Sequence, residues 1–325
     1  MQILRDLAEA DRAGAGAVVT IGVYDGVHRG HVEVLRLVRE LADARGLDAV
    51  CVTFDRHPAE VVRPESAPKQ LTTLEQRLEL LGATGYLDTC LVLTFDETRS
   101  KEPAEDFVRE VLVEGFRARL VVVGADFHFG HRRGGNVPLL ERMGAEFGFG
   151  VVGLGLVAAD EDPTGEPYSS TRIRELLAIG EVAAAARLLG RPHEVRGTVE
   201  IGDRRGRELG YPTANLAVPD RICLPADGVY AGTLVDGDGP DGKEVERPAA
   251  VSLGTRPTFY ADAGAALLEA YVLDFDGDLY GQYVKVRFLE RLRGQERFET
   301  VDVLVAQMAR DVDATRAIVG AVPPN

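Results

Sequence analysis

The hydrophobic pattern of this 325-residue chain changes once, near Gly190, and that change constrains the fold more than any other feature. Before it, short β-branched apolar runs alternate with amphipathic segments. Residues 31–45, for example, place Val34, Val38 and Leu41 on one helical face. This repetition predicts a Rossmann-like α/β domain, a parallel sheet with helices on both faces. The expected strands are residues 18–23, 49–54, 90–95, 120–124 and 151–156, and further helices are expected at 74–81 and 107–116.

After Gly190 the chain consists of short alternating stretches separated by Gly, Pro and Asp turns. This spacing is typical of an antiparallel barrel or sandwich. Residues 300–319 return to helical spacing, so we expect one helix to close this second domain. The expected strands are residues 194–201, 229–235, 249–253, 267–273 and 283–288.

The boundary between the two domains is predicted at Arg191-Pro192. Proline disfavours helical geometry at the residue before it, and here it follows a Leu-Leu-Gly sequence that is typical of a helix end. The predicted domains are therefore residues 1–190 and 191–325.

Charge and cysteine content exclude several classes of function. The net charge is −15, and acidic residues exceed basic ones in both halves, so a nucleic-acid or anionic membrane partner is not expected. The three cysteines, Cys51, Cys90 and Cys223, lie far apart without metal-binding spacing, which favours core thiols in a reducing compartment. No stretch approaches eighteen consecutive apolar residues. We expect a soluble, cytoplasmic protein.

The strongest local signal is the sequence TIGVYDGVHRGH at residues 20–31, an apolar run that enters a Gly-rich turn before a helix. Such a turn presents backbone N–H groups and a helix N-terminus to a phosphate. His28 and His31 are spaced so that both imidazoles can face the same phosphate chain. Two alternatives remain: a tight turn with incidental histidines, or a zinc pair completed by Asp55, His57 or His128.

Two polar clusters provide further candidate phosphate sites. The sequence SSTRIR at residues 169–174 precedes a predicted helix at 175–179, and it could equally be a helix cap with solvated arginines. The sequence GDRRGRELGYPTAN at residues 202–215 joins a basic Gly loop to a rigid turn. It offers N–H and guanidinium groups to phosphates, and side-chain oxygens to a hard cation such as Mg²⁺. By itself it could be a solvated polar turn.

Together these motifs resemble those of the prokaryotic bifunctional riboflavin kinase/FMN adenylyltransferase family, the FAD synthetases. Residues 20–31, called the histidine turn below, resemble the HxGH signature of nucleotidylyltransferases, and residues 169–174 resemble their SSTxxR motif. Residues 53–58 resemble TFDPHP, and residues 123–130 resemble VGxDFRFG, which shape the flavin and adenine pockets in that family. PTAN and the stretches that follow resemble a riboflavin kinase barrel. The departures are Arg56, His128, Tyr168 and Ser252.

The resemblance implies specific roles for residues of this chain. His28, His31 and Arg174 would stabilise charge during adenylyl transfer, and Glu269 would be the base toward the ribityl hydroxyl, although it could also be an exposed strand carboxylate. Thr213 and Asn215 would hold Mg²⁺. Phosphate contacts are implied for Gly22, Asp25, Gly26, Gly30, Ser169, Ser170, Thr171, Gly206, Arg207, Gly210 and Thr213. Flavin contacts are implied for Phe54, Asp55, His57, Pro58, Asp126, Phe127 and Phe129, of which the three phenylalanines could equally be core.

The implied function is two consecutive reactions. The barrel would phosphorylate riboflavin with ATP and release FMN and ADP, and the α/β domain would adenylylate FMN to FAD and release pyrophosphate. ATP is then a co-substrate, and no tightly bound redox cofactor is required. The alternatives are a family member with one active module, a non-catalytic flavin-binding protein, or another nucleotidylyltransferase, which would leave the barrel without a role. The sequence does not decide the oligomeric state.

Overall fold

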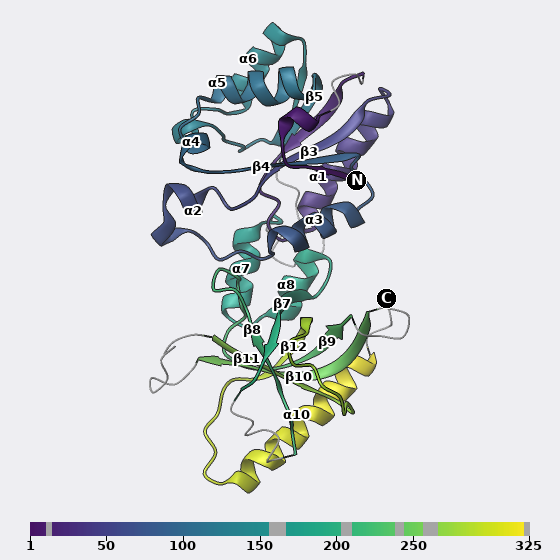
Figure 1. The fold of residues 1–325 in the computed structure, drawn as a ribbon, viewed down its shortest axis with the longest axis vertical. Coiled ribbons are helices and arrows are strands. Elements are labelled where there is room, and N and C mark those ends of the chain that lie inside the picture. Colours follow the sequence, from purple (N-terminus) through teal and green to yellow (C-terminus); the bar gives the residue numbers. More distant parts are fainter. Residues whose placement is uncertain (11–14, 156–166, 203–209, 238–243, 256–265, 322–325) are drawn as a thin grey trace. The chain divides into compact units, whose positions relative to one another are not determined.

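The computed structural model describes residues 1–10, 15–155, 167–202, 210–237, 244–255 and 266–321 (Figure 1). The chain forms two compact units, Met1–Ser170 and Thr171–Asn325, and each is described here by itself. Along the chain, helices α7 (Ser170–Ala178) and α8 (Val182–Leu189) follow the strands of the first unit and precede those of the second. The domain boundary that we propose between residues 190 and 191 comes directly after α8.

The first unit is built on a six-stranded sheet in which every pair is parallel, in the order β1-β4-β3-β2-β5-β6. The central strand β2 is buried at all five positions, as expected for a sheet covered on both faces. The order reverses between β2 and β5, and ligands bind at such switch points in open α/β sheets. The strands are β1 (Gln2–Leu4), β2 (Ala17–Ile21), β3 (Asp48–Phe54), β4 (Thr89–Leu93), β5 (Ala118–Gly124) and β6 (Gly150–Leu154).

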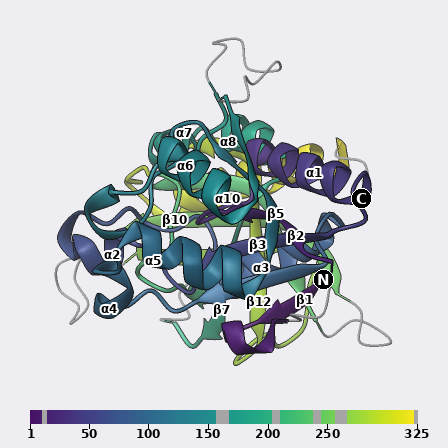
Figure 2. The same ribbon diagram turned by 90° about the horizontal axis from the view of Figure 1, so that it is seen from above.

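Helices cover both faces of this sheet, which confirms the predicted α/β layering. Helices α1 (Arg29–Asp43) and α3 (Leu74–Ala83) pack on one face, and α5 (Ala104–Phe107) and α6 (Val137–Phe147) on the other. Figure 2 shows α1 and α5 on opposite sides of the strands. Helix α5 is followed directly by a π-helix, η3 (Val108–Gly115), where a regular helix was expected. Shorter helical segments are η1 (Leu7–Glu9), α2 (Ala59–Val62), η2 (Pro64–Ser66), α4 (Glu97–Ser100) and η4 (His131–Arg133).

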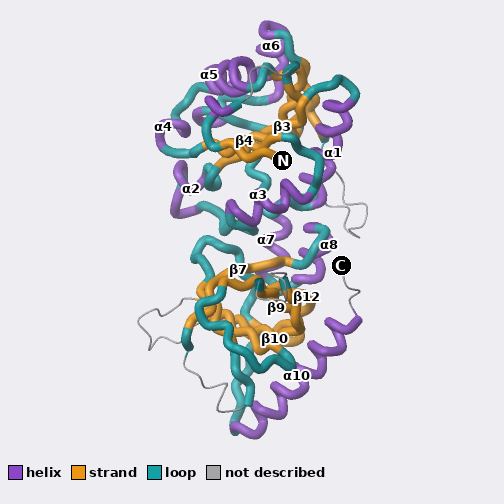
Figure 3. Tube along the Cα trace, turned by 45° about the vertical axis from the view of Figure 1, so that its right-hand side comes forward, coloured by secondary structure: helices purple, strands orange, loops and turns teal. Residues whose placement is uncertain are grey.

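The second unit is a closed antiparallel barrel, in the order β10-β11-β8-β7-β12-β9, which confirms the predicted barrel (Figure 3). Helix α10 (Val301–Ala321) packs against β9 and β10. Its buried Asp311 accepts a hydrogen bond at 2.8 Å from the guanidinium of Arg293, at the end of β12. The strands are β7 (His193–Glu200), β8 (Ala214–Ala217), β9 (Gly228–Asp236), β10 (Val245–Thr255), β11 (Ala266–Val272) and β12 (Tyr283–Arg293).

Several local expectations need correction. Helix α7 begins at Ser170, so the hydroxyls of Ser170 and Thr171, which were expected before a helix, occupy its first turn. Strand β8 begins at Ala214, so only the first half of PTAN is a turn. The three cysteines are buried thiols outside any disulfide bond, as predicted. None of the helices in the described ranges is both long enough and apolar enough to span a bilayer.

Candidate functional site

The histidine turn brings two imidazoles together at the start of helix α1. His28 is the N-cap residue, and its Nδ1 accepts the backbone N–H of His31 at 3.3 Å. The two rings stack with centroids 3.6 Å apart and planes inclined by 18°. Because Nδ1 of His28 is an acceptor, its neutral ring carries the proton on Nε2. The arrangement offers a ring N–H donor beside the backbone N–H groups of a helix N-terminus.

The turn that carries these histidines is strained. Tyr24 and Val27 have φ values of +54° and +38°, a region that L residues rarely adopt and that is least favourable for a β-branched side chain. Strain of this kind persists only where surrounding contacts fix it. The buried carboxylate of Asp25 supplies such contacts, because it accepts the N–H groups of Leu71 at 3.0 Å and Thr72 at 3.1 Å.

Thr72 is a functional neighbour that sequence reasoning missed. Its hydroxyl lies 3.2 Å from the Asp25 carboxylate and accepts the N–H of Gly26 at 3.1 Å. The sequence-predicted Asp25 therefore contacts the segment before α3. No motif marks Thr72, since its role depends on a contact between residues 46 positions apart.

Two other contacts bring the segment before α7 to the same turn. A Cβ added to Gly30 would lie 2.8 Å from Cβ of Tyr168, so only glycine fits this close approach without movement. The hydroxyl of Ser170 donates to the carbonyl of Asp25 at 2.8 Å. Ser169 is adjacent to Ser170 in the chain, and Thr171 and Arg174 follow it along α7. The histidine turn and the start of the SSTxxR sequence are thus neighbours.

Tyr24 packs beneath the histidine pair. Its ring lies 5.0 Å from that of His31, and its hydroxyl shares a hydrogen bond of 2.6 Å with Thr20. Burial raises the pKa of the Tyr24 phenol well above its ordinary value, and the nearby thiols of Cys51 and Cys90 act in the same direction. Tyr24 is therefore a neutral, fixed support for the His31 ring.

A cavity of about 490 Å³ opens at the carboxyl ends of β2, β3 and β5, beside the topological switch. Gly22 and Val23, which begin the histidine turn, form part of its wall. Phe54 and Phe95 meet edge to face at 5.4 Å, and Phe127 stacks on a neighbouring ring. The aromatic lining is Phe54, Phe95, Phe107, Phe127 and Phe129, and the polar and charged lining includes Arg99, Lys101, Glu102, His128, Arg132 and Arg133.

The structure places four predicted flavin residues on this wall, Phe54, Pro58, Phe127 and Phe129, and three away from it. Asp55 supports the wall, because its carboxylate accepts the N–H of Phe95 at 2.9 Å. Nδ1 of His57 accepts the N–H of Ala59 at 3.1 Å, and the carbonyl of Asp126 contacts Nδ1 of His128 at 2.7 Å. Sequence reasoning missed Phe95 and Phe107, although Phe95 could have been found as the aromatic residue that ends the predicted strand at 90–95.

The loop over residues 127–133 is hydrogen-bonded to residues 100–102 on the opposite wall of the cavity. The backbone N–H of His131 donates to the carbonyl of Glu102 at 2.8 Å, and Nδ1 of His131 contacts the carbonyl of Ser100 at 3.1 Å. Phe129 of this loop also pairs through its backbone with Gly135, just after the loop. Gly130 has φ +69°, and a Cβ there would lie 2.6 Å from Cβ of Ala104. This wall of the cavity is therefore a closely packed loop.

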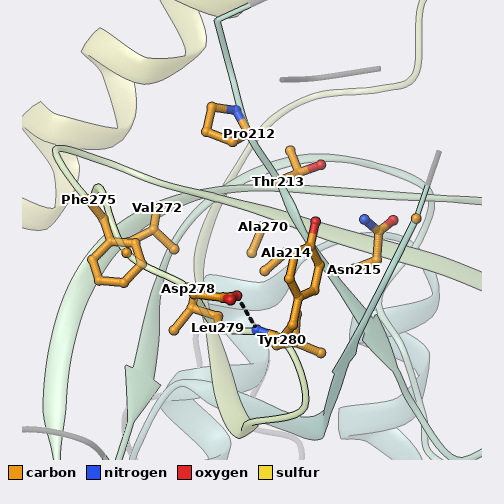
Figure 4. A pocket seen from close by; sticks show the side chains of 13 residues that line it. Pro212, Thr213, Ala214, Asn215, Ala270, Val272, Phe275, Asp278, Leu279 and Tyr280 are labelled. Carbon is orange, nitrogen blue, oxygen red and sulfur yellow. Dashed lines mark hydrogen bonds between the residues drawn. The ribbon is translucent and has the colours of Figure 1, made fainter. Parts of the chain in front are cut away.

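The barrel carries a smaller pocket of about 70 Å³, beside the start of β8 (Figure 4). Thr213 and Asn215 both line it, and their side-chain oxygens are of the kind that Mg²⁺ prefers. Gly202 lies so near that an added Cβ would come within 2.4 Å of the Asn215 amide nitrogen. Asp278, which also lines the pocket, accepts the N–H of Tyr280 at 2.9 Å. The donor set therefore fits a hard cation.

Glu269 does not line this pocket, but it stands next to a residue that does. On β11 it pairs with Asn215 of β8 on one side and with Ser252 of β10 on the other, so the three side chains share one face of the sheet. Gly210 adopts φ +85° just before the PTAN sequence. The predicted residues Gly206 and Arg207 lie outside the described ranges.

Comparison with known proteins gives matches over both units. The family model described as FAD synthetase matches residues 10–172, and the one described as riboflavin kinase matches residues 189–319. Proteins named bifunctional riboflavin kinase/FMN adenylyltransferase are similar over nearly the whole chain. The one from Pseudomonas fluorescens is 38% identical, with 98% of each chain covered, and the one from Escherichia coli K12 is 35% identical, with 100% of each covered.

A solved structure gives a similar fold over nearly the same length. A chain from Streptococcus pneumoniae, titled a macrolide-efflux protein, matches with a TM-score of 0.83 and 32% identity. The match covers 97% of this chain and 98% of that chain. The arrangement of an α/β unit followed by a barrel therefore occurs in a solved structure as well.

Proposed function

The chain belongs to the bifunctional riboflavin kinase/FMN adenylyltransferase family, and we propose how its residues carry out the two reactions that this name describes. It phosphorylates riboflavin to FMN and adenylylates FMN to FAD, with ATP as the co-substrate of both steps. The FAD synthetase part is the first unit, and the riboflavin kinase part is the barrel.

The flavin of FMN binds in the cavity of about 490 Å³. One observation carries this assignment: the aromatic cavity opens beside Gly22 and Val23, which lead directly into the histidine turn. A planar isoalloxazine can stack among the phenylalanine rings, and its ribityl phosphate can then extend toward His28 and His31. Asp55, His57 and Asp126 act from behind this wall: Asp55 holds the backbone of Phe95, His57 holds that of Ala59 next to Pro58, and the carbonyl of Asp126 contacts the His128 ring.

Adenylyl transfer takes place at the histidine turn. An oxygen of the FMN phosphate attacks the α-phosphorus of ATP, a new P–O bond forms, and the bond to the β-phosphate breaks to release pyrophosphate. The nucleophile is already anionic at neutral pH, so charge stabilisation matters more than a base. His28, His31 and Arg174 supply that stabilisation. Backbone and hydroxyl contacts to the phosphates come from Gly22, Gly26, Gly30, Ser169, Ser170 and Thr171, and Asp25 fixes the turn.

The kinase reaction takes place at the barrel pocket and the strand row beside it. Glu269 accepts the proton of the riboflavin 5′-hydroxyl while the hydroxyl oxygen attacks the γ-phosphorus of ATP, and ADP leaves. Thr213 and Asn215 are the residues that would hold Mg²⁺, which, when bound, neutralises phosphate charge. Gly206, Arg207 and Gly210 belong to the loop that we assign to the ATP phosphates.

The flavin site is tested with Phe54→Ala, and Phe147→Ala is the matched control, because Phe147 lies on α6 and does not line the cavity. Quenching of FMN fluorescence gives the dissociation constant. We expect Phe54→Ala to raise it by about tenfold, since an aromatic contact is worth about 0.5–1.5 kcal/mol beyond the apolar area that it buries, and 1.4 kcal/mol corresponds to tenfold. The control should stay within about twofold. Equal dissociation constants for both variants and the wild type would exclude this cavity as the flavin site.

Chromatography of the products tests the pair of reactions. The protein is incubated with ATP and Mg²⁺, once with riboflavin and once with FMN, and FAD is expected from both mixtures. FMN alone from riboflavin would mean that only the kinase is active, and FAD only from supplied FMN would mean that only the adenylyltransferase is active. No product from either mixture would favour a flavin-binding protein.

A further inference from the structure

We propose that Arg77 is a positioning residue for FMN adenylyl transfer, which fixes the histidine turn relative to the flavin cavity. This inference rests on the proposed assignment of FMN to that cavity. Arg77 lies on α3, outside every motif of the sequence, and it is 5% exposed.

The guanidinium of Arg77 joins the two chain segments that leave the sheet at this point. Its Nη1 donates to the carbonyl of Val23 at 2.7 Å, and its Nη2 donates to the carbonyl of Phe54 at 2.6 Å. Val23 begins the histidine turn, Phe54 ends β3, and both line the cavity. One planar side chain therefore sets the spacing between the phosphate side and the flavin side of the proposed site.

The sheet itself does not hold these segments together beyond its last rungs. The β2–β3 ladder ends with Ile21 opposite Val52, and one further bond joins the N–H of Gly22 to the carbonyl of Val52 at 3.0 Å. Past this point the hydroxyl of Thr53 also donates to the carbonyl of Val23, at 3.2 Å. A guanidinium presents two donors at a fixed separation, which a lysine ammonium cannot reproduce.

The surroundings of Arg77 indicate that this side chain positions the two segments and adds little to the stability of the fold. Burial is the largest influence on its pKa and lowers it. Its buried Nε has no hydrogen-bond acceptor among the described residues, and its two Nη atoms donate to carbonyls. Burying a charge in this way is costly, and a well-packed apolar side chain is often as stable. The segment before α3 also fixes Asp25 through Leu71 and Thr72, so the same scaffold holds the strained turn at two points.

The decisive experiment is the steady-state kinetics of Arg77→Lys. We expect kcat for FAD formation from FMN to fall by about 10- to 100-fold, because a small misplacement of reacting groups costs about this much. The KM values for FMN and ATP should stay within about threefold, since the aromatic wall and the phosphate contacts are unchanged. The riboflavin kinase activity of the same preparation is the internal control for folding and should stay within about twofold.

Arg39→Lys is the matched control variant. Arg39 lies on α1, pairs with Asp88 at 2.7 Å and donates to the carbonyl of Leu47 at 3.5 Å, but it does not line the cavity. It should leave kcat for FAD formation within about twofold. A similar loss of kcat in Arg39→Lys and Arg77→Lys would overturn the proposal, because it would reflect general destabilisation of the unit.

Thr53→Val keeps the test decisive if Arg77→Lys does not fold. This variant removes the other side-chain donor to the Val23 carbonyl and should lower kcat for FAD formation by about threefold or more with little change in KM. An unchanged kcat in Arg77→Lys, or in Thr53→Val where that variant replaces it, would overturn the proposal. Failure of the flavin assignment is separate, because it would appear as an unchanged FMN dissociation constant in Phe54→Ala.

Discussion

The imidazoles of His28 and His31 lie face to face, 3.6 Å apart, at the first turn of α1. Each ring therefore packs against the other and limits its movement. The Nδ1 of His28 also accepts a hydrogen bond from the backbone N–H of His31. Removing one ring takes away both a phosphate donor and the packing of its neighbour.

His31→Ala should lower kcat for FAD formation by about 100-fold or more, the usual cost of losing one preorganised donor. His28→Ala should have a similar effect, and the double variant should lose much less than the product of the two, because the rings act as a unit. Riboflavin kinase activity should remain. FAD formation within a few-fold of the wild type in His31→Ala would contradict the assignment of this histidine.

Gly130→Ala should raise the KM for FMN and destabilise the first unit. Alanine there must adopt φ +69° and also place its Cβ 2.6 Å from Cβ of Ala104, so the cavity loop has to move. Gly46→Ala is the matched control, since φ is +63° at that site and no atom lies within 4 Å of the added Cβ. It should cost about 1 kcal/mol of unfolding free energy and leave the KM unchanged. Equal KM values for both variants would contradict this account of the loop.

Glu269→Gln should suppress FMN formation from riboflavin while FAD formation from supplied FMN continues. The substitution keeps the size of the side chain and removes the carboxylate that accepts the hydroxyl proton, a contribution of about 100- to 10,000-fold in rate. Both activities are measured on one preparation by chromatography. Loss of both would point to misfolding, and a normal kinase rate would mean that Glu269 is only a strand carboxylate.

Glu194→Gln should lower the stability of the barrel in a pH-dependent way. Burial raises the pKa of Glu194, but hydrogen bonds from Arg196 at 2.8 Å and Arg287 at 2.9 Å outweigh burial, and the net pKa is lowered. A lowered pKa means that the ionised group stabilises the fold above the ordinary glutamate pKa of about 4.3, and this stabilisation disappears as pH falls through the lower folded value.

Urea unfolding at neutral and acidic pH measures this effect. At pH 7 the loss in Glu194→Gln should be about 2 kcal/mol, as expected for charge-assisted hydrogen bonds, and it should shrink at pH values below the ordinary range. Glu246→Gln is the control: Glu246 pairs with the same Arg287, but its side chain is 43% exposed, so the loss should be below about 1 kcal/mol. A loss for Glu194→Gln that is equal at every pH would contradict the prediction.

The sequence predicted the architecture well because hydrophobic periodicity reports the burial of long elements. The buried runs at residues 49–54 and 120–124 lie in β3 and β5, and residues 74–81 lie in α3. Strand β1 was missed, since three residues are too few to show a period and its partner β4 is distant in sequence. Periodicity also could not reveal the π-helix η3, whose apolar spacing resembles that of a regular helix.

The residues of the candidate site also fall into two groups, those that the sequence could predict and those that it could not. His28, Phe54 and Phe127 lie in recognisable motifs, and their positions at or beyond the carboxyl ends of strands β2, β3 and β5 follow from the parallel topology. Thr72 and Arg77 belong to no motif and act through backbone atoms, which any residue provides. Contacts of that kind depend on how distant segments pack, so only the structure reveals them.

The closed barrel and the open sheet should take up deuterium in different ways. Each barrel strand has a neighbour on both sides, so its amide hydrogens exchange only when several strands separate together. In the described part of the first unit, β1 and β6 form the outer margins of the sheet, and exchange should begin there. The ring formed by the described barrel strands also offers no free edge to which another polypeptide could add a strand, so barrel-to-barrel aggregation is not expected from the folded state.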